Sequence, residues 1–216
     1  MKLRINEIFY SIQGETSYMG RPCIFIRTSG CNLNCHWCDT RYANEEPGEL
    51  IAPELIPTQI EPFNCRLVSL TGGEPLLQAP TVAHLMNILL HLSYTVLLET
   101  NGSLSLSPIP AEIIKIIDIK PPSSGESGSF LEENWTYINP RQDQLKFLIA
   151  DEKDWSYALD FIRSQTHQLP AEILFSPVQG RLEPALLAEW MLRDHVSGRL
   201  QLQLHRIIWP LQTRGV

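Results

Sequence analysis

Short, almost continuously apolar segments recur along this chain, and most are followed by a turn and a helical pattern. Strands without apolar–polar alternation are covered on both faces, as in a parallel sheet. On this basis we predict strands at Cys23–Thr28, Leu67–Thr71, Thr95–Glu99, Ile116–Ile119, Gln144–Ile149, Ile173–Ser176 and Leu200–Leu204.

Helical patterns lie between these segments, at Thr81–Leu92, Trp155–Ser164 and Pro184–Leu192. Strands that alternate with helices indicate an α/β fold with right-handed crossovers. A closed eight-stranded barrel typically needs about 250 residues, whereas this chain has 216. We therefore expect a partial, open (β/α) barrel in which residues 1–216 form a single domain.

Two stretches that follow predicted strands are expected to be irregular. Asn44–Asn64 contains four prolines, which are too many for a long helix. Pro121–Glu133 is rich in Pro, Ser and Gly and is expected to be a loop. Ligands of open α/β sheets and barrels bind beyond the carboxyl ends of the strands, where both stretches begin.

The charge balance favours a small molecule over a nucleic acid as the partner. The chain has 17 basic and 24 acidic side chains, a net charge of −7, whereas nucleic-acid binding usually needs a basic face. No apolar run approaches the roughly 18–20 residues of a transmembrane helix, and the N-terminus does not resemble a signal peptide. We expect no membrane contact and a cytoplasmic location, where thiols stay reduced.

Three of the five cysteines, Cys31, Cys35 and Cys38, lie within eight residues of one another. This clustering and the odd total indicate metal ligands rather than a disulfide framework. Three thiols in one loop would leave one iron of a [4Fe–4S] cluster without a protein ligand. A single zinc ion would instead need a fourth ligand, and His36 is awkwardly placed for that role. The other two cysteines are expected to be buried structural thiols.

The cysteine spacing, with Trp37 just before the third cysteine, resembles that of the radical S-adenosylmethionine (SAM) superfamily. A second element of that superfamily follows the next predicted strand and contains Gly72, Gly73 and Glu74. Consecutive glycines let the backbone approach a ligand closely, and the charge of Glu74 suits the ammonium group of SAM. The resemblance implies a [4Fe–4S] cluster, SAM as a source of the 5′-deoxyadenosyl radical, and a low-potential reductant such as flavodoxin.

Further segments are similar to the 7-carboxy-7-deazaguanine synthases, a family within that superfamily. The similar segments are Ile5–Glu15, Phe25–Arg27, Cys38–Thr40, Glu99–Gly102 and Gln203–His205. The resemblance implies a lyase that rearranges 6-carboxy-5,6,7,8-tetrahydropterin to 7-carboxy-7-deazaguanine, releasing ammonia, in queuosine or 7-deazapurine biosynthesis. It also implies a homodimer and a radical SAM barrel trimmed to about six core strands.

The resemblance assigns roles to individual positions. The substrate would be bound by Ile12, Gln13, Gly14, Glu15, Arg27, Thr71 and His205, with Arg27 meeting its carboxylate. SAM would be bound by Trp37, Cys38, Asp39, Gly73, Glu74, Asp118, Ile119 and Lys120. Thr40 would coordinate a Mg²⁺ ion that also meets substrate oxygens.

Simpler interpretations remain open for several of these positions. Gln13 and Glu15 would also suit a solvated turn, His205 a sheet position, and Thr40 a helix cap that acts through its hydroxyl group. One departure from the family lies at Phe175 and Ser176, near which many members carry Gln.

Two other functions are also compatible with the cysteine loop. One is another small radical SAM enzyme, such as an activase that installs a glycyl radical, and the other is a zinc-binding module. The Pro-rich stretch 44–64 has no clear equivalent in the synthase family.

Overall fold

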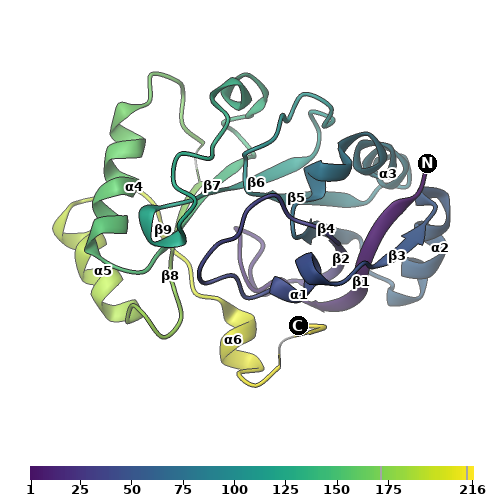
Figure 1. Ribbon diagram of the computed structural model, residues 1–216, viewed down its shortest axis with the longest axis horizontal. Coiled ribbons are helices and arrows are strands. Elements are labelled where there is room, and N and C mark those ends of the chain that lie inside the picture. Colours follow the sequence, from purple (N-terminus) through teal and green to yellow (C-terminus); the bar gives the residue numbers. More distant parts are fainter. Residues whose placement is uncertain (171, 213) are drawn as a thin grey trace.

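The computed structural model describes residues 1–170, 172–212 and 214–216, and its framework is one nine-stranded sheet (Figure 1). The strands run in the spatial order β3-β1-β2-β4-β5-β6-β7-β8-β9. Their bounds are β1 Leu3–Ile12, β2 Pro22–Thr28, β3 Glu49–Ile51, β4 Leu67–Gly72, β5 Thr95–Thr100, β6 Ile114–Ile119, β7 Gln144–Ile149, β8 Glu172–Pro177 and β9 Arg199–Leu200. The strands from β2 to β9 are parallel, and β1 is antiparallel to both β2 and β3.

The six long parallel strands, β2 and β4 to β8, confirm the expectation of about six core strands. Because β3 and β9 form the two edges of the sheet, the barrel is open. Each of the six was predicted from its apolar run, since helices or the barrel interior cover both faces of a central parallel strand.

Helices follow most of the parallel strands, and the three predicted ones are present with shifted ends. The helices are α1 Arg41–Glu45, α2 Ile56–Ile60, α3 Ala79–His91, α4 Glu152–Ser164, α5 Pro184–Arg193 and α6 Leu204–Ile208. The apolar faces of α3, α4 and α5 join the strands in one large core that includes Leu85, Trp155 and Leu187. In Figure 1, α4 and α5 lie on one flank of the sheet and α3 lies on the other.

The predicted strand Leu200–Leu204 is mostly wrong. β9 ends at Leu200, and one further backbone bond, from the Gln201 N–H to the Phe175 carbonyl at 2.8 Å, completes its pairing with β8. The chain then turns into α6, because the N–H of Leu204 donates to the carbonyl of Gly14 at 2.9 Å. A long-range contact with the start of the chain, rather than local propensity, therefore decides this segment.

The antiparallel strand β1 and the edge strand β3 were not predicted as strands. β1 buries Leu3 and Ile5 and is half-exposed along much of its remaining length. The Pro-rich stretch 44–64 has no long helix, as expected, and is built of short pieces. These pieces are the end of α1, β3, α2 and the 3-10 turns Pro53–Leu55 and Glu61–Phe63.

The loop 13–21, which joins β1 to β2, closes the barrel at the N-terminal ends of the parallel strands. The N–H of Ser17 donates to Oε1 of Gln144 at 3.0 Å, and Nε2 of Gln144 donates to Oγ of Ser17 at 2.7 Å. Gln144 is the first residue of β7, on the other side of the barrel. This loop therefore forms a floor beneath the space inside the curved sheet.

Below that floor, a buried ion pair joins β6 to the residue that precedes β7. Nζ of Lys115 lies 2.9 Å from Oδ2 of Asp143, and the two side chains are 1% and 0% exposed.

The described part of the chain has no helix that is both long and apolar enough to cross a membrane.

The Lys115–Asp143 ion pair gives a prediction for stability. Lys115→Met should lower the free energy of unfolding by about 3–5 kcal/mol, because it leaves a buried carboxylate without its partner. Chemical denaturation followed by circular dichroism measures the change. An unchanged midpoint would show that the folded protein does not depend on this ion pair.

Candidate active site

A cavity of about 560 Å³ opens at the carboxyl ends of the parallel strands. All but two of the predicted site residues line it. These residues are Ile12, Gln13, Gly14, Glu15, Arg27, Cys31, Cys35, Trp37, Cys38, Asp39, Thr40, Thr71, Gly73, Asp118, Lys120 and His205. The exceptions are Glu74 and Ile119, since Glu74 is fully buried and the side chain of Ile119 belongs to the apolar core.

The three clustered cysteines lie on the loop between β2 and α1, on one wall of the cavity. Burial raises the pKa of Cys31, and it raises that of Cys35 to about 11. Within the described ranges, no group of three or more His, Cys, Asp or Glu side chains is arranged to hold a single metal ion. A set of three soft thiols on one loop, facing a cavity, fits an iron–sulfur cluster.

Gly72 and Gly73 let the end of β4 pack directly against the start of the cysteine loop. A Cβ atom on Gly73 would collide with the carbonyl of Gly30, and one on Gly72 would collide with Thr28. The N–H of Gly73 donates to the Thr28 carbonyl at 3.2 Å. The glycines are therefore needed first for a backbone-to-backbone contact within the protein. The expected close approach of this backbone to a ligand stays a prediction.

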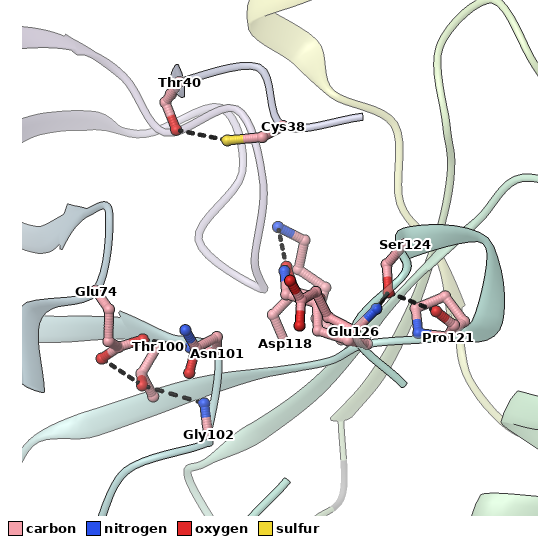
Figure 2. Close-up of polar contacts among 12 residues, drawn as sticks. Cys38, Thr40, Glu74, Thr100, Asn101, Gly102, Asp118, Pro121, Ser124 and Glu126 are labelled. Carbon is pink, nitrogen blue, oxygen red and sulfur yellow. Dashed lines mark hydrogen bonds and ion pairs between the residues drawn. The ribbon is translucent and has the colours of Figure 1, made fainter. Parts of the chain in front are cut away.

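The carboxylate of Glu74 is bound within the protein. One oxygen of its carboxylate accepts from the Thr100 hydroxyl at 2.8 Å, as Figure 2 shows, and from the Leu76 N–H at 2.9 Å. The other oxygen accepts from the Asn101 N–H at 2.8 Å. Burial raises the pKa of this carboxyl group. The side chain joins the ends of β4 and β5 and does not present its charge to the cavity. The expected contact with the ammonium group of SAM stays a prediction, and the Glu74 carboxylate is buried and already accepts three hydrogen bonds within the chain.

Trp37 is held in place by two residues that the sequence analysis missed. Its Nε1 donates to the Ser123 hydroxyl at 3.1 Å, and Ser123 in turn bonds to the buried carboxylate of Asp154 at the start of α4. The ring packs on Leu148 and its apolar neighbours. One face of the indole also receives Lys120, whose Nζ lies 5.4 Å from the ring centroid.

Arg27 is oriented by a second pair of missed residues. Its Nε donates to Oε1 of Glu7 at 2.8 Å, and the same oxygen accepts from the Tyr42 hydroxyl at 2.7 Å. In the described part of the chain, nothing accepts from the two terminal nitrogens of Arg27, which lines the cavity. A planar fork fixed at one edge and open at the other is suited to a carboxylate.

Thr40 precedes α1, but its side chain makes no capping hydrogen bond. The hydroxyl instead lies 3.8 Å from Sγ of Cys38, as Figure 2 shows. The alternative that this hydroxyl caps the helix is therefore wrong. Its neighbour Asp39 faces α6, where its carboxylate lies 3.4 Å from Arg206.

Gln13 is almost fully buried, so the alternative of a solvated turn is wrong. Its amide donates to Oε1 of Glu99 at 3.3 Å and accepts from the Glu15 N–H at 3.0 Å. Between them, Gly14 is covered by His205, because a Cβ atom on Gly14 would lie 2.5 Å from Nδ1 of that ring. His205 lies on α6 rather than in the sheet, so the alternative of a sheet histidine is wrong as well.

A group of buried or half-buried charges lines the cavity and consists of Glu15, Glu99, Asp118, Lys120 and Lys146. Lys146 forms ion pairs with Glu15 and, at 3.8 Å, with Asp118, which lies 3.0 Å from Lys120. The role of Lys146 and the position of Glu99 were missed. The available signal was a charged residue inside an otherwise apolar parallel strand, which is unusual unless that residue is paired.

The residues at the departure from the family, Phe175 and Ser176, are both buried. Phe175 stacks on Phe147 at 5.7 Å between ring centroids, and the Ser176 hydroxyl donates to the carbonyl of Gln201 at 2.8 Å. Gln179, a few residues further along, lines the cavity instead.

Comparisons with known proteins agree with this geometry. Residues 25–119 match the model of the Radical SAM superfamily. The chain is 44% identical to the 7-carboxy-7-deazaguanine synthase of Chlorobaculum tepidum, over 99% of this chain and 97% of that protein. It is 38% identical to the synthase of Koribacter versatilis, over 99% and 100%. The crystal structure of QueE from Escherichia coli superposes with a TM-score of 0.78 at 22% identity, over 95% of both chains.

The glycine contact gives a prediction. Gly73→Ala should displace the cysteine loop, because the added methyl group would collide with Gly30. Iron bound after anaerobic reconstitution should fall to a small fraction of the wild-type content. Gly180→Ala is a matched control, since a Cβ there meets nothing within 4 Å and only the positive φ of 75° is strained. Full iron content in Gly73→Ala would contradict this account.

Proposed function

The chain belongs to the 7-carboxy-7-deazaguanine synthases of the radical SAM superfamily, and from this premise we propose how its residues share the work. It is a lyase of queuosine biosynthesis that forms 7-carboxy-7-deazaguanine from 6-carboxy-5,6,7,8-tetrahydropterin with release of ammonia. The observation that carries the proposal is that one cavity holds both kinds of group. One wall holds the cysteine loop, and the floor and opposite wall hold the polar groups that suit a carboxylated pterin.

Membership of the superfamily implies a [4Fe–4S] cluster and SAM. Cys31, Cys35 and Cys38 would hold the cluster. When bound, these cofactors supply a radical that can remove a hydrogen atom from carbon 6 of the pterin. Trp37 offers an apolar face for the adenine, and Ser123 keeps this ring in one orientation. The closed floor of the cavity keeps water away from reactive species.

The substrate would lie between Arg27 and the loop 13–21. The open edge of the Arg27 guanidinium would bind the substrate carboxylate, because its other edge is already engaged by Glu7. The carboxylate of Glu15 and the amide of Gln179 would meet the ring, which has several N–H donors and a carbonyl acceptor. His205, which covers Gly14, would contact the pterin ring from the side of α6. Thr71 lines the wall next to Arg27.

A Mg²⁺ ion would be held by Thr40. Magnesium prefers oxygen ligands and usually keeps several waters. The hydroxyl of Thr40 lies beside Cys38 and makes no helix-capping hydrogen bond, so it can supply one such ligand. Substrate oxygens and water would complete the shell, so binding would be weak until the substrate arrives and would then fix the position of carbon 6.

Several wider features belong to the same proposal. All five cysteines are free, which fits a reducing cytoplasm. One sheet runs from β1 to β9, which supports a single functional domain of residues 1–216. A flavodoxin-type reductant would supply the electron, and the working form would be a homodimer.

The test of the function is direct. Anaerobically reconstituted protein with SAM, dithionite, Mg²⁺ and 6-carboxytetrahydropterin should produce 7-carboxy-7-deazaguanine, detected by its absorbance and mass. Reconstituted protein that cleaves SAM without forming the deazapurine would overturn the substrate assignment. It would leave another small radical SAM enzyme as the better reading.

The ligand set gives a second prediction. Cys31→Ala, Cys35→Ala and Cys38→Ala should each lose the cluster and all activity, measured as iron and sulfide per chain. Cys65→Ala is the matched control and should keep both, because its thiol lies outside the cavity and donates to the Pro22 carbonyl at 3.3 Å. Loss of iron in Cys65→Ala would show that the ligand set is wrong.

The proposed magnesium site gives a third prediction. Thr40→Ala should keep the cluster and SAM cleavage in the absence of substrate, yet lose the stimulation of turnover by Mg²⁺. Turnover measured against magnesium concentration, with Thr40→Ser as the variant that retains the hydroxyl, separates this from a folding defect. Wild-type turnover that does not respond to chelation or to added magnesium would remove the metal from the proposal.

A further inference from the structure

Lys146 is a buried cation in a strand whose other side chains are mostly apolar. It lies on β7, its side chain is 9% exposed, and it lines the cavity. Burying a lysine is costly unless a negative charge compensates. The reason for a charge at this position must therefore lie in the groups that surround Lys146.

The surroundings of Lys146 contain three carboxylates, each from a different element. Glu15 comes from the loop 13–21 and forms the direct ion pair. Asp118 comes from β6, at 3.8 Å, and itself pairs with Lys120. Glu99 comes from β5 and adds a third negative charge, which acts on Lys146 through space.

Glu15 in turn faces groups from three elements. Lys146 lies on one side of it, and Nε2 of Gln203, just before α6, donates to its Oε1 at 2.9 Å. The His205 ring on α6 attracts the Glu15 carboxylate electrostatically when it carries a proton, and the Glu99 carboxylate repels it. The ion pair with Lys146 is the one contact in this set that brings a full charge directly onto the carboxylate.

The comparison of two neighbouring carboxyl groups shows the effect of that contact. Burial alone would raise the pKa of both Glu15 and Glu99. Glu15, paired directly with Lys146, has its pKa lowered to about 2. Glu99, whose contacts are hydrogen bonds from Ser69 and Gln13, keeps a raised pKa.

We propose that Lys146 is a positioning residue that determines substrate specificity through Glu15. It holds Glu15 as an ionised acceptor for a ring edge that carries two adjacent N–H donors. The aminopyrimidinone edge of a pterin has such a pair, one on the ring and one on the exocyclic amine. A protonated Glu15 would place its own O–H against these donors and lose one acceptor. This inference rests on the proposed function, since it takes a pterin as the substrate.

The variant Lys146→Met tests this by its dependence on pH. Without the cation, burial should raise the pKa of Glu15 above its ordinary value. Below that raised pKa the group is protonated and binds the pterin weakly, and binding returns as the pH rises through it. Near pH 6 the Kd for 6-carboxytetrahydropterin should therefore be roughly 10- to 100-fold above wild type, the range for loss of a charged hydrogen bond. The difference should shrink toward pH 9.

The binding measurement is made anaerobically on the reconstituted enzyme, with four comparisons. Wild type should show a nearly constant Kd over this range, and Lys146→Arg should stay within a few-fold of it. The double variant Glu15→Gln, Lys146→Met should bind weakly at every pH, because an amide cannot ionise. Lys115→Met removes another buried lysine from an ion pair away from the cavity, and its Kd should match wild type.

Each outcome has a defined meaning. A Lys146→Met enzyme whose affinity equals wild type, or whose loss does not change with pH, overturns the role of Lys146 while leaving the synthase assignment intact. Recovery at high pH in the double variant would assign the titration to a group other than Glu15 and would also overturn it. Wild-type enzyme that fails to bind the pterin at any pH would instead overturn the proposed substrate.

Discussion

The close backbone contact between the ends of β2 and β4 determines much of the rest of the site. The backbone of Gly72 and Gly73 lies against Thr28 and Gly30 with no room for a side chain. That contact fixes where the cysteine loop leaves β2. Because Glu74 then ties the same turn to the end of β5, three consecutive parallel strands and the loop form one rigid wall of the cavity.

Paired charges make up much of the rest of the site. Arg27, Lys146 and Lys120 line a cavity where an unpaired ion would be strongly disfavoured. Their carboxylate partners are Glu7, Glu15 and Asp118, respectively. Such pairs add little to net stability, but each holds a polar group in one orientation. Orientation matters most in a reaction in which one hydrogen atom must be removed from one carbon.

An open barrel needs other segments to enclose its interior. The loop 13–21 closes the N-terminal ends of the strands through Gln144, and the segment around α6 covers the gap beside β1 through Gly14. Figure 1 shows α6 and the C-terminus near α1, on the side where the sheet is open. The substrate groups on loop 13–21 and on α6 are thus also the groups that seal the barrel.

The sequence by itself determined the parallel core and most of the site. Continuous apolar runs predicted the six long strands, and the spacing of Cys31, Cys35 and Cys38 predicted the ligand loop, since both signals are local. The tertiary structure decided what depends on residues far apart in the chain. It turned the segment after Leu200 into α6 through a bond to Gly14. It also withdrew Glu74 from the cavity and placed Lys146 beside Glu15. Pairings of this kind follow from how strands are brought together, and no spacing in a single sequence encodes them.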